Sequence, residues 1–238
     1  MGLNPATVNT SLPLCGIEQP RQVHTIADRF ATANTYIIDA HPLIVVDPRS
    51  EMHVQLLCEY IESILKRSLA EIGMIVLTNL HADQLAGLAA MRRVVYAPVA
   101  AAAALLRLAQ SQRETLHAYG WSRPSRGVLP PSFERQMRFV SDWLEDGTYI
   151  SSCWQVIACS GHSPDSLCLY NSATAEFISG DTVIAIQRRT PVLRASSDRH
   201  QLETMLRFLR TLHVHYVYPG YGRPVLALHP LSNLGVEW

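Results

Sequence analysis

The sequence lacks a long apolar run, an excess of charge of either sign, and any C-x-x-C pair. No apolar stretch approaches the roughly 18 residues that a spanning helix needs, so we expect no membrane partner. Lys plus Arg and Asp plus Glu number 20 each. This balance disfavours nucleic acid as a partner, because phosphate binding needs a basic surface. Residues 1–16 hold neither a basic residue nor a long apolar segment, so we expect no secretory signal.

Cysteines are few and scattered. The five occur at Cys15, Cys58, Cys153, Cys159 and Cys168. An odd, widely spaced set fits reduced thiols in the cytosol better than a disulfide framework. We therefore predict a cytoplasmic protein.

The 238 residues, 48% apolar and 17% charged, are enough for one α/β domain that spans 1–238. Two β-branched runs, 33–39 and 43–47, flank Ala40-His41-Pro42 and predict a hairpin. Apolar residues at helical spacing predict a helix over 52–69, and a strand follows at 72–77.

A helical insertion is predicted at about 99–142. Five consecutive alanines followed by leucines favour a helix over 99–117, and the proline-rich stretch 120–132 is expected to be a loop. Outside the insertion, the sequence predicts short strands at 94–98, 154–159, 167–170, 176–179 and 214–218, with a helix at 198–212.

Thr78-Asn79-Leu80-His81-Ala82-Asp83-Gln84 is the most informative stretch, because it lies between a predicted strand and a predicted helix. Such strand ends are where α/β folds place ligands. His81 and Asp83, two residues apart in a turn, can face a common centre. Three further polar or glycine-rich turns follow strands, at 160–164, 180–182 and 219–222. They can converge with the first at one edge of a two-sheet sandwich.

These turns resemble the motifs of the metallo-β-lactamase superfamily. The first is similar to T-H-x-H-x-D-H, with Asn79 and Gln84 in place of histidines. Residues 159–170 resemble P-G-H-T-P-G-S-x-x-L-Y, Ile178-Ser179-Gly180-Asp181 resembles F-x-G-D, and 218–224 resembles P-G-H-G with Tyr221 in place of histidine. The opening hairpin also matches, so the resemblance runs in family order over about 30 to 225. It implies an αββα sandwich, two mixed sheets with helices on the outer faces, closest to the glyoxalase II and thioesterase-like branch.

The resemblance also implies a site for two metals, usually zinc, bridged by an aspartate. It assigns the first metal to Asn79, His81, His162 and the shared Asp181, and the second to Asp83, Gln84, Tyr221 and the same Asp181. Three of these seven positions carry changed residues. Amide oxygens are poor zinc ligands, so the standard two-metal chemistry is not expected.

Two states of the site remain open. His81, His162 and Asp181 suffice for one zinc or iron ion, because two imidazoles and a carboxylate can hold a catalytic metal. Alternatively, the same residues form a metal-free polar cluster, since aspartate and histidine satisfy each other by hydrogen bonds. His229 is the one other histidine expected as a substitute ligand. His213 and His215 are expected on the last strand, about 20 Å from this edge.

Three functions follow from these states. The first is a mononuclear metal-dependent hydrolase of an ester or thioester, with Asp83 as general base and Tyr221 donating to the oxyanion. The second is an inactive pseudoenzyme whose Asn79, Gln84 and Tyr221 bind a small molecule or a partner protein. A minor third is a mononuclear iron enzyme similar to persulfide dioxygenases. The resemblance favours the hydrolase and the ligand chemistry favours the pseudoenzyme. Neither the substrate nor the oligomeric state follows from the sequence.

Overall fold

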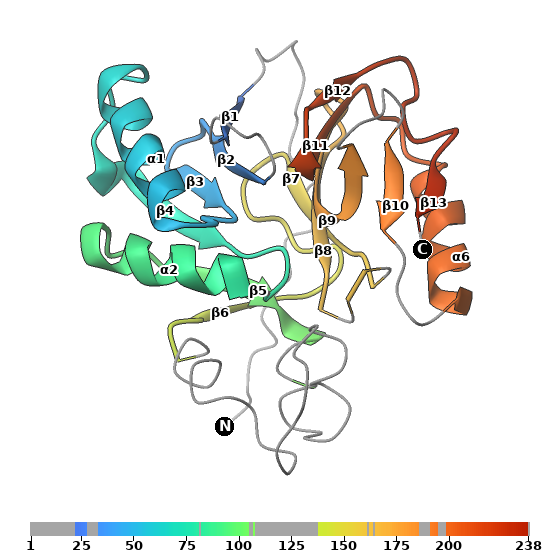
Figure 1. Cartoon of the computed structure of the whole chain (residues 1–238), viewed down its shortest axis with the longest axis horizontal. Helices are drawn as coiled ribbons and strands as arrows, with labels where there is room; N and C mark the ends of the chain where they lie inside the picture. The colour runs from blue at the N-terminus through green and yellow to red at the C-terminus, as the bar shows by residue number, and fades with distance from the viewer. Residues whose placement is uncertain are drawn as a thin grey trace, which may run out of the picture.

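Two β-sheets pack face to face in the computed structural model, which describes residues 22–27, 33–80, 82–104, 107, 138–160, 162–163, 165–185, 191–194 and 199–237. The first sheet runs in the order β1-β2-β3-β4-β5-β6 (Figure 1). Its strands are β1 (Val23–Ala27), β2 (Asn34–Ile38), β3 (Leu43–Val46), β4 (Ile72–Val76), β5 (Val99–Ala102) and β6 (Asp142–Leu144). The first three strands pair antiparallel, and β3 to β6 pair in parallel.

The second sheet has the order β12-β11-β9-β10-β13. In addition, β8 pairs with β9, and β7 pairs with β8. Its strands are β7 (Trp154–Ala158), β8 (Leu167–Asn171), β9 (Glu176–Ala185), β10 (Val192–Arg194), β11 (Tyr216–Gly222), β12 (Val225–Leu226) and β13 (Gly235–Glu237). The long β9 is buried throughout and pairs in parallel with β11. This pairing places the Asp181 region beside the last motif.

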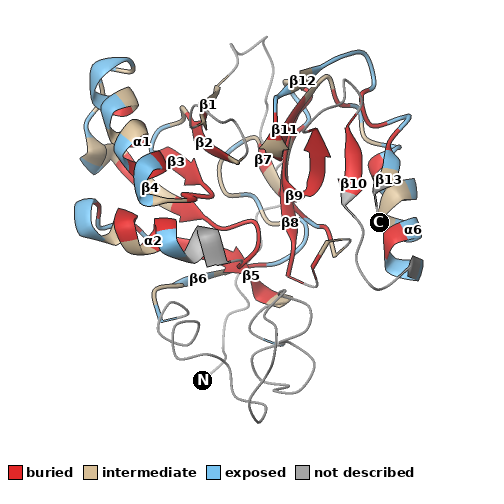
Figure 2. Cartoon of the chain, in the orientation of Figure 1, coloured by how far each residue is buried: buried red, intermediate tan, exposed pale blue. Residues whose placement is uncertain are grey.

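Helices cover the outer face of each sheet. Helices α1 (Glu51–Ser63) and α2 (Ala82–Val94) pack on the first sheet, and α6 (Arg199–Leu209) packs on the second (Figure 1). An apolar cluster fills the space between the two sheets. Tyr36 and Val76 of the first sheet contribute to it, as do Trp154 and Ile178 of the second. The strands are buried while the helices expose their outer faces (Figure 2). The predicted αββα sandwich is therefore confirmed.

Most predicted elements form close to their predicted positions. The hairpin is β2 and β3, and the turn between them contains the His41-Pro42 peptide bond. The helix after it is α1, which begins one residue earlier than predicted because the Ser50 hydroxyl caps its N-terminus. It ends at Ser63, six residues before the predicted end. A short 3-10 turn, η1 (Leu69–Glu71), then leads into β4.

The prediction around residues 94–104 is wrong. Val94 ends α2, and the alanine run opens as the strand β5 instead of a helix. β5 lies between β4 and β6, and its four residues are buried. Small side chains fit this central position, so sheet pairing and burial override the helix propensity of alanine. The predicted insertion therefore begins after β5, and most of it lies outside the described residues.

The expectation of uniformly reduced cysteines is also wrong. Cys153 is disulfide-bonded, whereas Cys58, Cys159 and Cys168 are free thiols. Burial raises the pKa of the Cys159 thiol well above its ordinary value, so this cysteine is a poor nucleophile.

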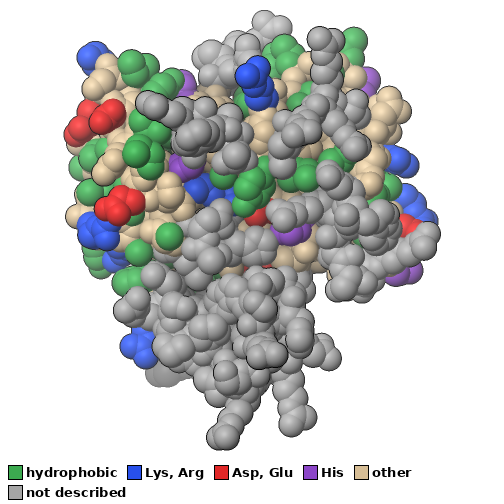
Figure 3. Space-filling view, viewed as in Figure 1, with side chains coloured by type: hydrophobic (Ala, Val, Ile, Leu, Met, Phe, Trp, Pro, Cys, Tyr) green, Lys and Arg blue, Asp and Glu red, His purple; other side chains and the backbone are tan. Residues whose placement is uncertain are grey.

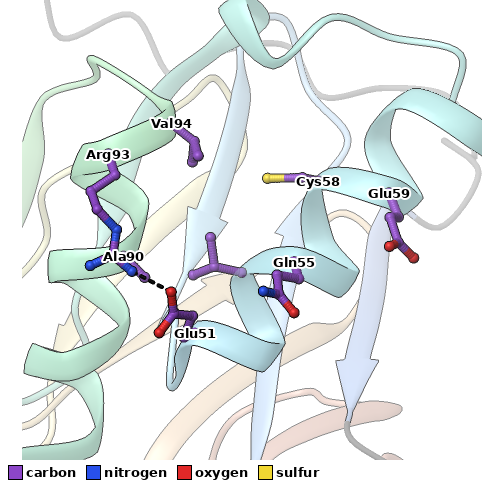
Figure 4. A pocket seen from close by; sticks show the side chains of 8 residues that line it. Glu51, Gln55, Cys58, Glu59, Ala90, Arg93 and Val94 are labelled. Atoms are coloured by element: carbon purple, nitrogen blue, oxygen red, sulfur yellow. Dashed lines mark hydrogen bonds and ion pairs between the residues drawn. The ribbon is translucent and has the colours of Figure 1, made fainter.

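The described surface carries charged side chains of both signs and a pocket between two helices. Basic and acidic side chains are interspersed on the face in Figure 3. Within the described residues, no helix is both long enough and apolar enough to cross a membrane. A pocket of 320 Å³ lies between α1 and α2, lined partly by Cys58, Ala90 and Val94 (Figure 4). The guanidinium of Arg93 donates to Glu51 beside it at 2.6 Å.

Candidate functional site

Asp47, at the end of β3, holds the first motif turn. The Thr78 backbone N–H donates to its Oδ1 at 2.8 Å, and the Thr78 hydroxyl donates to its Oδ2 at 2.6 Å. Gly180 packs against the same threonine. A Cβ at Gly180 would lie 2.1 Å from Thr78 Oγ1, and its φ of +49° is in the left-handed region. Only glycine fits there without strain, so the first and third motifs are joined at this point.

The second motif turn is bonded to the first across the two sheets. The Leu167 N–H donates to the Thr78 carbonyl at 2.8 Å, and the Leu80 N–H donates to Asp165 Oδ2 at 3.0 Å. Asp165 also accepts a bond from the Ser163 hydroxyl at 2.7 Å. These bonds fix the ends of β4 and β8 side by side.

The last motif reaches the same place through Asn34 of β2. The Asn34 amide donates to the carbonyls of Pro219 at 2.9 Å and of Gly222 at 2.6 Å. Between them, Gly220 comes so close to Asp181 that a Cβ would lie 2.4 Å from its Oδ1. Described residues of the first and last motif turns, Asn79 and Gly220, thus lie against the Asp181 carboxylate of the third.

A buried arginine is bonded directly to that carboxylate. Nη2 of Arg49 lies 2.5 Å from Oδ1 of Asp181, and the Asn79 amide donates to Oδ2 at 3.2 Å. The side chains of Arg49 and Asp181 are 1% and 0% exposed. The guanidinium also lies 3.7 Å from Asp47 Oδ2 and 5.0 Å from the centre of the Tyr221 ring. Arg49 is therefore the cation around which the site is built.

The two aspartates share this one guanidinium. Burial raises the pKa of Asp47 from 3.8 to about 6, against the opposing effects of Arg49 and Thr78, and the Asp181 charge adds to the rise. Buried carboxylates near one another cannot both ionise easily. The electrostatic balance of the site therefore depends on Arg49.

The structure describes some of the predicted site residues and not others. Asn79 and Asp181 are buried and bonded to each other, whereas His162 and Tyr221 are half-buried. His81 lies outside the described residues. Asp83 and Gln84 belong to the first turn of α2, but their side chains lie outside the description. The predicted grouping of His81 with His162 and Asp181 stays a prediction.

Sequence reasoning missed Arg49, Asn34 and Asp165. Arg49 follows an Asp-Pro pair at a strand end, where a charged residue is usually exposed, so its burial had no signal in the residue pattern. Asn34 was counted only as part of the hairpin. Asp165 stands where the resembling motif has glycine, and that departure was the one available signal.

The described side chains around Asp181 do not fit a metal centre. Both carboxylate oxygens accept hydrogen bonds, one from a guanidinium and one from an amide. A metal ion at either oxygen would meet a fixed positive charge or a neutral amide donor, and zinc prefers imidazole or thiolate neighbours. Among the described residues, no group of three or more His, Cys, Asp or Glu side chains, as oriented, can hold a metal ion.

Comparison with known proteins gives one family. The profile of the Metallo-beta-lactamase superfamily matches residues 28–221. No curated protein matches the chain. Among solved structures, TTHA1623 in a di-iron-bound form is 23% identical with a TM-score of 0.58, over 90% of this chain and 98% of its own.

Two structures described as metallo-β-lactamases are also similar in fold. The B3 enzyme BLEG-1 is 21% identical with a TM-score of 0.59, covering 86% of this chain and 93% of its own. A Cronobacter sakazakii protein with a HARLDQ motif is 14% identical with a TM-score of 0.58, covering 84% and 75%. At these identities the likeness concerns the fold.

Proposed function

The chain belongs to the metallo-β-lactamase superfamily, and from this premise we propose that it is a metal-free member of the family. It binds a polar ligand at the edge around Asp181, where the family holds its metals. The observation that carries this proposal is the buried ion pair between Arg49 and Asp181. In the family the equivalent aspartate bridges two cations. Here one guanidinium supplies the positive charge at that carboxylate.

Electrostatics supports this exchange. A buried carboxylate without a counterion costs several kcal/mol, so loss of the metals would leave Asp181 destabilised. Arg49 offsets that cost with its attraction and hydrogen bond to Asp181, and it stays charged at every accessible pH. A metal ion beside it would repel the guanidinium in a low-dielectric interior. The ion pair and a metal therefore compete for the same oxygen atoms.

The groups around the ion pair are suited to hydrogen bonding. The Asn79 amide and the Tyr221 hydroxyl each can donate and accept, and Gln84 adds a second amide in the sequence. Neutral groups of this kind favour an uncharged or weakly charged polar molecule. A test is a thermal-shift screen of small polar compounds on the wild type and on Asn79→Ala. A ligand of this edge should raise Tm in the wild type and have little effect on the variant. Equal shifts for every compound in both proteins would refute binding at this edge.

A mononuclear hydrolase is the second candidate, with metal on His81, His162 and Asp181. One comparison favours it. The HARLDQ motif of the Cronobacter sakazakii metallo-β-lactamase ends in the same Asp-Gln pair as Asp83-Gln84, so glutamine at this position occurs in a protein described as a metallo-β-lactamase. The di-iron form of TTHA1623 makes iron as well as zinc worth testing.

Turnover separates the two candidates. Ester and thioester substrates would be assayed with the wild type and Asp181→Asn, each supplied with zinc or iron(II). The metal-free proposal predicts equal background rates for both proteins. Chelator-sensitive turnover that disappears in Asp181→Asn would establish the hydrolase instead.

A further inference from the structure

Three histidines from two segments of the chain meet at the start of β11, at the opposite end from the Asp181 edge. The ring centres of His213 and His215 lie 4.7 Å apart, those of His213 and His229 lie 5.5 Å apart, and those of His215 and His229 lie 6.2 Å apart. His215 precedes Tyr221 by six residues, which is about 20 Å of extended chain. The expectation of His229 as a substitute ligand at the Asp181 edge is therefore wrong.

The fold explains why these histidines come together. His213 and His215 flank Val214, which is fully buried, so in an extended segment both rings point away from the core. β12 then returns along β11 in antiparallel pairing, and the Ala227 N–H donates to the His215 carbonyl at 3.1 Å. The chain continues to His229, whose φ of 53° turns the backbone back toward the pair.

We propose that His213, His215 and His229 together bind one divalent transition-metal ion, and that this ion is zinc. The three centroid distances define a triangle whose equidistant point lies about 3.2 Å from each ring centre. A zinc ion held by imidazole nitrogen at roughly 2.0–2.1 Å lies at about that distance from the ring centre. The spacing of the rings therefore fits one shared ion.

As they stand in the described structure, these three rings do not form a group that could hold a metal ion, so we infer that binding requires the rings to turn. Little opposes this movement. His213 and His229 are exposed and His215 is half-buried. Within the described part of the chain, no hydrogen bond holds a nitrogen of these three rings. Rotation about the side-chain bonds of exposed residues is fast and inexpensive.

The backbone beneath the rings is fixed, which favours binding. The Tyr170 hydroxyl donates to the His213 carbonyl at 2.9 Å. The His215 N–H donates to Ala175 at 2.8 Å, and the His229 carbonyl accepts from the Ser232 N–H at 3.0 Å. Only side-chain torsions remain to be ordered when an ion binds, so the entropic cost is small. Three imidazoles leave a fourth position open to water or to another ligand.

Zinc titration of the tag-free protein at pH 7.5, followed by calorimetry, tests the proposal. We expect one equivalent of zinc in the wild type. His213→Gln, His215→Gln and His229→Gln should each weaken the affinity at least tenfold, by analogy with losses at known metal sites. His200→Gln, at an exposed histidine of α6, is the matched control and should leave the affinity within about twofold. NMR signals of the three imidazoles should shift together on binding.

The opposite results are as clear. Absence of zinc binding tighter than about 1 mM would overturn the proposal. Zinc binding that persists in the triple variant His213→Gln/His215→Gln/His229→Gln would also overturn it, because the ion would then bind elsewhere. If adding Asp181→Asn to the triple variant abolishes this remaining binding, the zinc ion lies at the Asp181 edge. That result would separately contradict the proposed metal-free function. Thermal unfolding of each variant checks that it is folded.

Discussion

Nη2 of Arg49 lies 2.5 Å from Oδ1 of Asp181, and neither side chain is accessible to solvent. The two residues are 132 positions apart in the chain: Arg49 follows β3 of the first sheet, and Asp181 lies in β9 of the second. Their pairing connects the end of β3 with the middle of β9. It also satisfies the one carboxylate that, in the family, is shared by two metals.

Arg49→Met should lower the free energy of unfolding by about 3–5 kcal/mol, because it leaves Asp181 buried without its cation. Arg93→Met is the matched control. Arg93 pairs with Glu51 at 2.6 Å, but the two side chains are 61% and 69% exposed, so its loss should cost at most about 1 kcal/mol. Urea unfolding measures both. Similar effects for the two variants would contradict a buried pair.

The double variant Arg49→Met/Asp181→Leu should recover much of the stability lost in Arg49→Met. Replacing both partners of a buried ion pair with apolar groups is often close to neutral. If the double variant is instead as unstable as the sum of the two single variants, the residues do not act as a pair.

Asp47 should make stability fall as pH rises. Its pKa is raised from 3.8 to about 6 in the folded protein, so the folded state holds the proton more tightly than the unfolded state. Below a pH of about 4, Asp47 is protonated in both the folded and the unfolded state, so the free energy of unfolding does not change. Between pH of about 4 and 6 the unfolded state ionises first, and the accumulated loss reaches about 3 kcal/mol.

Asp47→Asn removes this titration while it keeps the shape of the side chain. The difference in free energy of unfolding, variant minus wild type, should rise by about 3 kcal/mol between pH 4 and pH 7. Denaturant unfolding at four pH values measures it. A difference that stays constant with pH would show that Asp47 has the same pKa in both states.

Gly220→Ala should disturb the site, because the new Cβ would lie 2.4 Å from Asp181 Oδ1. The clash should destabilise the fold by about 1–3 kcal/mol. Gly235→Ala is the control, since its Cβ would meet Val192 at 3.8 Å, an ordinary contact. A Gly220→Ala variant as stable as Gly235→Ala would mean that β11 and Asp181 are further apart than described.

Restoring the three family histidines should create metal binding only when Arg49 is also removed. Asn79→His/Gln84→His/Tyr221→His supplies the missing imidazoles, but the guanidinium still occupies Asp181. Adding Arg49→Ser should raise zinc affinity at least tenfold, because zinc then replaces the lost positive charge. Zinc should also raise the Tm of the fourfold variant.

Calorimetry of both restored variants, each carrying glutamine at 213, 215 and 229, measures this effect without the surface histidines. Equal zinc affinity in the threefold and fourfold variants would show that Arg49 does not compete with metal. Esterase activity in the fourfold variant alone would further support the ancestry of the site.

The sequence was enough to predict the sandwich, because its motifs occur in family order and its apolar runs match strands. It failed where the environment reverses a local preference. The alanines of β5 favour a helix by propensity, and only their place between β4 and β6 makes them a strand. The strand predicted at 176–179 is also longer in the structure, where β9 runs over Glu176–Ala185 and is buried throughout. A strand covered on both faces has no alternating apolar pattern that would mark its length.

The site was predictable in its positions and less so in its chemistry. The motifs indicated Asn79 and Asp181, which the structure joins at 3.2 Å. The role of Arg49 depends on a contact between residues far apart in sequence, and no periodicity or spacing encodes such a contact. The cluster of His213, His215 and His229 was hidden for the same reason, because the β12 turn that brings His229 back is only two residues of strand.

Zinc titration of the variant His213→Gln/His215→Gln/His229→Gln tests the central claim most directly, because it probes the Asp181 edge alone. With Arg49 paired to Asp181, we predict no zinc or iron(II) binding tighter than about 100 μM. One equivalent bound at micromolar affinity or better, and lost in the same variant carrying Asp181→Asn, would contradict the account.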